Sequence, residues 1–116
     1  MSATQLESEI TGFTGVEKIF YPTGELYSEV FKLNGKENGI KKWYYKYKSG
    51  ELYSEVNFID GKENGIYKAY RESGQLYYES NYIDGKENGT AKYYLESGEL
   101  NYEVDFINGI VQLQPQ

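Results

Sequence analysis

The residues that could do chemistry include a ladder of glutamates, one at the same position of each of four similar sequence segments. The ladder consists of Glu29, Glu55, Glu79 and Glu103. Two carboxyl groups roughly 5 to 9.5 Å apart can hydrolyse a glycosidic bond. Equivalent positions in successive β-hairpins lie about 10 Å apart, two strand spacings, and lysines are expected opposite three of the four. We therefore interpret the ladder as a charged row that fixes sheet register, and we predict no catalytic residue and no enzyme.

Two acidic loop segments are the candidate metal ligands. One contains Asp60 and Glu63, and the other contains Asp84 and Glu87. Calcium-binding loops space their Asp, Asn and Glu ligands much more densely than this. The chain has no cysteine and no histidine, which removes thiolate sites, disulfides and the commonest transition-metal ligand. We predict no metal site and no cofactor.

Aromatic side chains are the more informative group, since they make up 17% of the chain and include 14 tyrosines. Tyrosine suits a half-buried pleated surface, which accounts for most of them. The run from Trp43 to Lys48 is denser than a sheet requires, and aromatic residues with basic neighbours are typical of protein interfaces. The predicted partner-binding residues are Trp43, Tyr44, Tyr45 and Tyr47, extended by Tyr70 and Tyr94 in adjacent hairpins.

Charge and hydropathy exclude several partner classes. The chain has 12 basic and 18 acidic residues, a formal net charge of -6. This balance is a poor match to phosphate backbones and anionic membranes, so we predict no nucleic acid and disfavour membrane binding. No stretch approaches the roughly 18 consecutive apolar residues of a membrane span. The first ten residues do not resemble a signal peptide, which slightly favours the cytoplasm.

An internal repeat of 24 residues organises the chain, as the match between Gly50–Ser73 and Gly74–Ser97 shows. An earlier copy, Gly24–Ser49, has two extra residues near Tyr45–Lys48, and a truncated copy begins at Gly98. Glycines separate two short segments per unit that are rich in the strand formers Tyr, Phe, Val and Ile. Each unit therefore predicts a strand, a tight turn, a second strand and a longer loop.

Repetition of this unit predicts an all-β fold, an elongated single-layer antiparallel meander of stacked β-hairpins. We assign residues 15–113 to this repeat domain. Residues 1–14 form an N-terminal lead-in segment, with its flexibility left open, and residues 114–116 form a tail.

The Ser-Gly pairs, such as Ser73-Gly74, are predicted to be two-residue hairpin turns, because glycine readily adopts the positive φ that such turns need. The segment 60–65 is predicted to be the longer loop. This register places lysines opposite the ladder glutamates in three hairpins, but it places Tyr44 opposite Glu55 and requires a bulge or longer turn in the irregular unit. The three predicted pairs are Lys18–Glu29, Lys68–Glu79 and Lys92–Glu103. An Asn108-Gly109 turn similarly predicts the pairs Phe106–Val111 and Val104–Leu113.

Alternation along the strands sorts the side chains into two faces. The predicted core face contains Leu26, Ser28, Val30, Leu52, Val56, Phe58, Leu76, Tyr78, Tyr82, Leu100, Tyr102, Val104 and Phe106 and, across the turns, Tyr21, Ile19, Ala69, Leu95 and Tyr93. The other face contains the Glu and Lys pairs together with Tyr53, Tyr70, Tyr77 and Tyr94.

The repeated motif G-x-L-x-x-E-x-x-F/Y-x-D/N-G-K-E-N-G-x-x-K-x-Y, which runs from about Gly15 to Gly109, resembles the MORN-repeat variant family. The resemblance implies one β-hairpin per unit, stacked into an elongated sheet, in a bacterial repeat protein. Some bacterial members are described as antitoxins, and related repeats are linked with membrane phospholipids in some eukaryotic proteins. Lipid-kinase activity is not expected, because no glycine-rich phosphate loop opens a helix here.

These observations predict a non-catalytic protein–protein interaction module. Its sharpest version is an antitoxin, in which this acidic chain binds and neutralises a more basic toxin. The alternative is glycan or lipid-headgroup binding through the tyrosine-rich face. Open edges at the first and last strands also allow a homodimer, because unpaired edges are templates for another chain.

Overall fold

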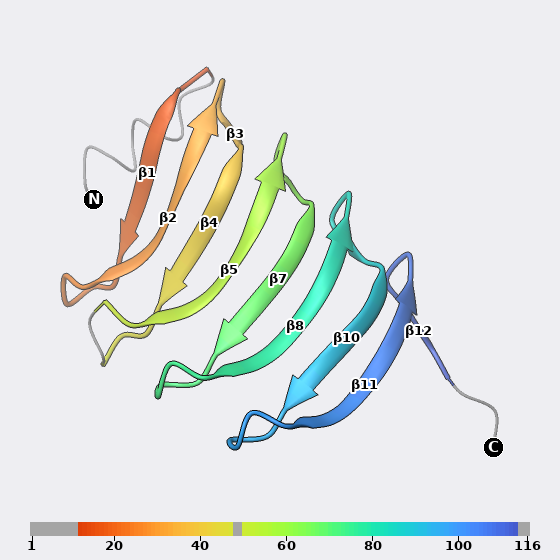
Figure 1. Ribbon diagram of the computed structural model, residues 1–116. Helices are drawn as coiled ribbons and strands as arrows, with labels where there is room; N and C mark the ends of the chain where they lie inside the picture. Colours follow the sequence, from red (N-terminus) through yellow and green to blue (C-terminus); the bar gives the residue numbers. More distant parts are fainter. Residues whose placement is uncertain (1–11, 48–49, 114–116) are drawn as a thin grey trace.

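The chain folds into one open antiparallel sheet (Figure 1), as predicted. The structure, a computed structural model, describes residues 12–47 and 50–113. Its 12 strands form a single layer, and the molecule measures 54 × 31 × 17 Å. Most of the predicted lead-in and the whole of the predicted tail lie outside the described residues. In the part that is described, no helix is long and apolar enough to cross a membrane.

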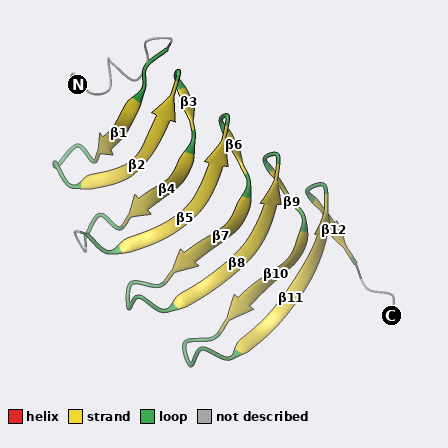
Figure 2. Ribbon diagram, turned by 45° about the horizontal axis from the view of Figure 1, so that its top comes forward, coloured by secondary structure: helices red, strands yellow, loops and turns green. Residues whose placement is uncertain are grey.

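The strands follow one another through the sheet in chain order, and Figure 2 shows the hairpins stacked side by side. The main path is β1-β2-β4-β5-β7-β8-β10-β11-β12, and the two-residue strands β3, β6 and β9 pair back onto β2, β5 and β8. The bounds are β1 Gly15–Phe20, β2 Leu26–Leu33, β3 Lys36–Glu37, β4 Gly39–Tyr44, β5 Leu52–Ile59, β6 Lys62–Glu63, β7 Gly65–Tyr70, β8 Leu76–Ile83, β9 Lys86–Glu87, β10 Gly89–Tyr94, β11 Leu100–Ile107 and β12 Ile110–Gln112.

The tightest turns lie at the Asn-Gly and Asp-Gly pairs. Asp60 and Gly61 both have positive φ, 49° and 83°, the requirement of a two-residue type I′ turn. Chain reversal there lets β6 pair with the end of β5. The prediction of one longer loop over 60–65 was therefore wrong, because that segment contains a tight hairpin and a short return strand.

The turn at Asn108-Gly109 confirms the predicted pair Phe106–Val111. The ladder ends at Gln112, so the predicted pair Val104–Leu113 lies beyond it.

The Ser-Gly turns are longer than predicted, and a bulge compensates for the difference. Gly74 N–H donates to the carbonyl of Arg71 at 2.8 Å, and Arg71 N–H donates to the carbonyl of Gln75 at 2.8 Å. The loop thus has three residues, 72–74, and the register then shifts so that Tyr77 is left unpaired in β8. Because the extra loop residue and the bulge cancel, the three predicted Lys–Glu pairs are confirmed.

The irregular unit accommodates its two extra residues in the turn. Tyr45 N–H donates to the carbonyl of Glu51 at 3.0 Å, so the extra length lies between these two residues. Lys42 is consequently opposite Glu55. The predicted pairing of Tyr44 with Glu55 was wrong, and the predicted longer turn is confirmed.

The bulges also change the predicted faces. Tyr53 and Tyr77, at equivalent bulges, contact Tyr45 and Tyr93 at ring separations of 5.0 and 6.2 Å. They therefore lie on the face of the buried side chains, whereas the sequence had placed them on the opposite one. Leu52 and Leu76 were predicted on the core face but lie on the face of the Lys–Glu pairs. They are directly opposite Tyr44 and Tyr70, which lie on that face, and directly opposite residues share a face.

We call the face with the buried side chains the tyrosine face and the one with the Lys–Glu row the charged face. The buried residues of the tyrosine face are Val30, Val56, Phe58, Ala69, Ala91, Ser28, Ser54, Ser80 and Glu17. With so few buried apolar residues, the long polar side chains of this face must cover much of the backbone.

Repeated hydrogen bonds join successive units at both edges of the sheet. At the tight-turn edge, the N–H of Gly61 donates to the carbonyl of Glu37 in the preceding unit at 2.8 Å, and Gly85 and Gly109 repeat the bond. At the opposite edge, the hydroxyl of Tyr45 donates to the carbonyl of Tyr70 in the next unit at 2.6 Å. Tyr21 and Arg71 make the equivalent bonds, to Tyr44 and Tyr94.

Candidate functional site

The charged face contains one continuous row of alternating charges. Pairing between neighbouring hairpins places Glu29 opposite Lys42 and Glu55 opposite Lys68, in addition to the pairs within hairpins. The full row is Lys18, Glu29, Lys42, Glu55, Lys68, Glu79, Lys92 and Glu103. Opposite charges on directly facing residues stabilise a sheet by a few tenths of a kcal/mol to about 1 kcal/mol each.

Three of the predicted partner-binding tyrosines bond to this row. The hydroxyls of Tyr44, Tyr70 and Tyr94 donate to Glu29, Glu55 and Glu79 at 2.7, 3.1 and 2.5 Å. Burial and the hydrogen bond to Glu29 raise the pKa of Tyr44 to about 12. The hydrogen bond to Glu79 raises the pKa of Tyr94 to about 12. These glutamates therefore act as acceptors for neutral phenols and organise the face.

The other three predicted residues lie elsewhere. Trp43 is opposite Ser54 on the tyrosine face. Tyr45 lies at the turn with its ring against Tyr53. Tyr47 lies in the loop and is 90% exposed. The structure thus gathers Tyr44, Tyr70 and Tyr94 into one row but distributes the run 43–47 over both faces and a loop.

The tyrosine face is hollowed over β5, β7, β8 and β10. The hollow is open and has a volume of about 660 Å³. Eight tyrosines line it, together with Arg71, Glu72 and Glu87. Seven of them lie in these strands: Tyr53, Tyr67, Tyr70, Tyr77, Tyr78, Tyr82 and Tyr93. This arrangement offers aromatic surface with a carboxylate and hydroxyls at fixed places.

Ring contacts hold these tyrosines in a connected cluster. Tyr67 contacts Tyr78 and Tyr82 at centroid separations of 6.0 and 6.1 Å. Tyr93 lies 4.5 Å from Tyr78 and stacks on Tyr102 at 4.6 Å. Such aromatic pairs contribute about 0.5–1.5 kcal/mol beyond the burial of their area, so the cluster is organised before any ligand arrives.

Glu87 is the carboxylate of the cluster. It accepts hydrogen bonds through Oε2 from the Tyr78 hydroxyl at 2.6 Å and the Ser80 hydroxyl at 2.7 Å. Burial and the bond to Glu87 raise the pKa of Tyr78. Burial raises the pKa of Tyr82 to about 12, with further contributions from Glu87 and Glu63. The phenols around Glu87 therefore stay protonated at neutral pH.

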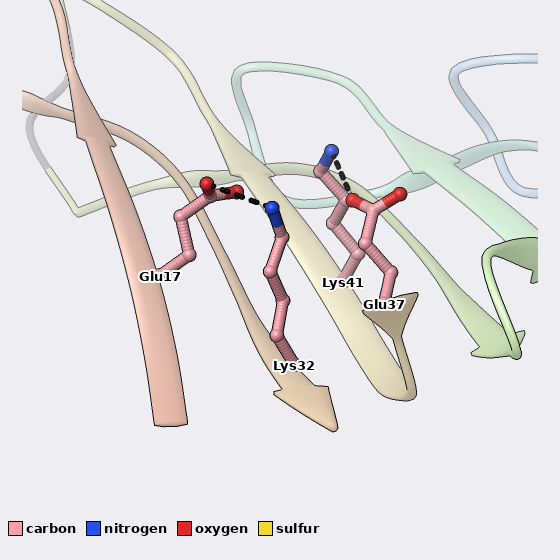
Figure 3. Close-up of polar contacts among 4 residues, drawn as sticks. All are labelled: Glu17, Lys32, Glu37 and Lys41. Atoms are coloured by element: carbon pink, nitrogen blue, oxygen red, sulfur yellow. Dashed lines mark hydrogen bonds and ion pairs between the residues drawn. The ribbon is translucent and has the colours of Figure 1, made fainter. Parts of the chain in front are cut away.

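Two lysines near the N-terminal end of the sheet form ion pairs (Figure 3). Lys32 Nζ lies 3.1 Å from Glu17 Oε2, and Lys41 Nζ lies 2.7 Å from Glu37 Oε2. Glu17 is only 8% exposed. Lys41 also lies 5.1 Å from the Trp43 ring centroid and 5.8 Å from that of Phe58, which is the geometry of a cation–π interaction.

Sequence reasoning did not identify the hollow. Tyr78, Tyr82 and Tyr93 were assigned to the core, and Tyr53 and Tyr77 to the other face. The signal that could have located them is the Gly of each three-residue loop, since a loop with glycine at its last position is commonly joined to a bulge. Among the described residues, no group of three or more His, Cys, Asp or Glu side chains could hold a metal ion.

Comparisons with known proteins bear on the fold and the family. No curated protein matches the chain. A chain in the crystal structure of accessory secretory proteins 1, 2 and 3 of Streptococcus pneumoniae is similar over 92% of this chain and 20% of its own length. It shares 17% sequence identity with a TM-score of 0.48, and the present chain spans a fifth of it.

The family comparison is more specific. The family described as the MORN repeat variant matches residues 13–31, 63–84 and 87–108, which together make up more than half of the chain. These stretches contain the bulged hairpins in which β1 pairs with β2, β7 with β8 and β10 with β11. The chain therefore belongs to the MORN repeat variant family.

Proposed function

We propose that this protein is a non-catalytic binding module that recognises another protein through its tyrosine face. The observation that supports this most is the open hollow lined by a connected cluster of tyrosines. Tyrosine supplies a large contact area at low conformational-entropy cost, and it is enriched at the energetic centres of interfaces. A stacked-hairpin repeat presents such a surface on an extended and rigid sheet.

Charge supports a basic partner. The net charge of -6 attracts a positively charged protein and speeds its association. The sharpest version of the proposal is an antitoxin that covers a basic toxin. It is tested by co-expressing the chain with neighbouring genes of its source genome. Absence of any relief of toxicity would contradict this version and leave the binding proposal in place.

Partner capture with matched variants tests the proposal itself. The intact chain serves as bait in source-cell lysate, with mass spectrometry as the readout. Tyr77→Ala removes a hollow-lining ring that is 43% exposed, and Tyr27→Ala removes the ring at the equivalent bulge outside the hollow, which is 39% exposed. We expect one stoichiometric protein, reduced at least about tenfold by Tyr77→Ala, as for an interface hot spot.

The control decides how the result is interpreted. Equal losses with Tyr27→Ala and Tyr77→Ala, or no loss with Tyr77→Ala, would contradict binding at the hollow. A third variant, Tyr47→Ala, examines the exposed loop of the aromatic run. A loss confined to Tyr47→Ala would move the proposed interface to that loop.

Binding of a glycan or lipid headgroup is a second candidate. The hollow volume of about 660 Å³ lies within the range of ordinary small-ligand sites, and its tyrosine rings offer stacking surfaces. A glycan array and liposome sedimentation test this candidate. Blank results from both at high protein concentration would contradict it.

A further inference from the structure

On the tyrosine face, the ammonium groups of Lys32 and Lys41 lie beside carboxylates of the same face. Each lysine places its ammonium group against a glutamate (Figure 3). The Lys41 ammonium also lies over the rings of Trp43 and Phe58. The site at Lys41 thus consists of a carboxylate, Glu37, and the rings of Trp43 and Phe58. The protein supplies its own cation there.

Later units keep the carboxylate and lose the lysine. Glu37 corresponds to Glu63 and Glu87 in the next two units, at the end of the two-residue strand. The position of Lys41, four residues later, is occupied by Tyr67 and then by Ala91. Ala91 is 0% exposed, so its small side chain lies beneath larger neighbours.

The position of Lys32 changes in the same way. Lys32 pairs with Glu37 across the tight turn, and the equivalent partners of Glu63 and Glu87 are Phe58 and Tyr82. Both lysine positions are therefore aromatic or aliphatic in the units that form the hollow. The carboxylate of Glu87 lies there among tyrosine rings.

The surroundings of Glu87 leave room for a cation. The hydrogen bonds that its carboxylate accepts from the hydroxyls of Tyr78 and Ser80 both use Oε2. Arg71, the cation that lines the hollow, directly follows β7 at the loop edge, next to the start of β8. Its guanidinium lies 4.8 Å from the Tyr77 ring centroid and donates to the carbonyl of Tyr94 at 3.0 Å. Arg71 is thus bound at the loop edge, whereas Glu87 is at the tight-turn edge opposite Tyr82.

We infer that the hollow receives a lysine side chain of the partner protein, with its ammonium group at Glu87 among the rings of Tyr67, Tyr78, Tyr82 and Tyr93. A charge-assisted hydrogen bond to the carboxylate and cation–π attraction from the rings would act together. That the lysine belongs to a partner protein rests on the proposed function. The site itself can be tested without knowing the partner.

The test is an NMR titration of the full, isotopically labelled chain with Nα-acetyl-lysine amide, whose side-chain ammonium group is free. N-acetyl-norleucine amide, which has the same aliphatic stem and no charge, is the matched neutral probe. We expect saturable shifts of the amide resonances of Tyr67, Tyr78 and Glu87, with about tenfold tighter binding of the lysine probe. Such a ratio is the size that cation–π attraction and a partly buried ion pair give.

Two glutamine variants locate the site. Glu87→Gln should abolish the preference for the lysine probe. Glu37→Gln makes the same change at the equivalent position, where Lys41 already fills the site, so it should leave the preference intact. The dispersion of each spectrum reports whether the variant is folded. Tyr93→Leu removes one ring and keeps Glu87, and it should weaken the lysine probe several-fold.

Equal binding of the two probes, shifts that do not saturate, or equal effects of Glu87→Gln and Glu37→Gln would each overturn the inference. The proposed function fails in a different way. If Tyr77→Ala lowers partner capture and Glu87→Gln does not, the binding module stands and the lysine site is wrong. If the lysine probe binds at Glu87 and Tyr77→Ala leaves capture unchanged, the cation site stands and the proposed interface is wrong.

Discussion

At the scale of single residues, the charged face repeats one hydrogen bond three times, from a tyrosine phenol to a glutamate of the row. The contact occurs at Tyr44, Tyr70 and Tyr94 with the same spacing of 15 residues back to the acceptor. The raised pKa of Tyr44, about 12 against an ordinary value of 10, means that folding favours its neutral form. Stability from this group is therefore fully present below pH 10 and is lost as the pH rises toward 12.

Tyr44→Phe removes the donor and keeps the ring. We expect the free energy of unfolding to fall by about 1 kcal/mol at neutral pH, because a hydrogen bond to a partly exposed acceptor is lost. We also expect the variant to lose less additional stability than the parent chain between pH 10 and pH 12. Urea unfolding followed by tryptophan fluorescence at several pH values measures both effects.

Tyr47→Phe is the control, since its ring is 90% exposed in the loop. It should change stability by less than about 0.5 kcal/mol. If Tyr44→Phe were as small in effect as Tyr47→Phe, the hydrogen bond to Glu29 would contribute nothing measurable to the fold.

At the scale of elements, the sequence predicted the strands, the repeat and the Lys–Glu register but not the turns. Glycine spacing shows where a positive φ is available, yet both turn types of the unit contain such a glycine. The sequence therefore did not distinguish the turn at Ser73-Gly74 from the turn at Asp60-Gly61. The first was predicted to be the shorter, but it has three loop residues and the second has two. The three-residue loop 72–74 needs a bulge at Tyr77 to keep Lys68 opposite Glu79. That bulge turns the Tyr77 side chain to the tyrosine face, where it lines the hollow.

Gly61→Ala tests the tight turn. Gly61 has a φ of +83°, and a Cβ there would meet no atom within 4 Å. The cost therefore comes from backbone conformation alone, and we expect a loss of about 1 kcal/mol in the free energy of unfolding. Chemical denaturation measures it.

Asp60→Asn is the matched change at the preceding residue, whose φ is 49°. Asparagine accepts positive φ at least as readily as aspartate, and Asn-Gly is strongly favoured in type I′ turns. We expect stability to be unchanged or slightly increased. A large loss from Asp60→Asn would mean that the aspartate has a role other than turn formation.

At the scale of the whole molecule, each unit touches its neighbours, and within residues 12–47 and 50–113 no second layer covers the sheet. Stability is then close to a sum of unit and neighbour terms. β5 contains three buried residues, whereas β11 contains none among its eight. Local opening should therefore begin near β11 and β12 and spread inward.

Native-state hydrogen exchange measures this gradient. We expect the amides of β5, β7 and β8 to be the most protected and those of β11 and β12 to exchange faster, because fewer buried contacts oppose local opening there. Uniform protection over all strands would show instead that the sheet opens as one cooperative unit.

The hydrogen bonds that join the units at both edges have an evolutionary consequence. Their donors and acceptors recur at the same repeat positions, from Gly61 to Glu37 at one edge and from Tyr45 to Tyr70 at the other. A gene duplication that copies one 24-residue unit in frame therefore also copies its tight-turn junction, and it copies the loop-edge junction where the unit carries the side-chain donor, as Gly50–Ser73 does with Arg71. Unequal recombination between the similar segments Gly50–Ser73 and Gly74–Ser97, which are identical at 16 of 24 positions, would lengthen or shorten the sheet by whole hairpins, with the tight-turn junctions already matched.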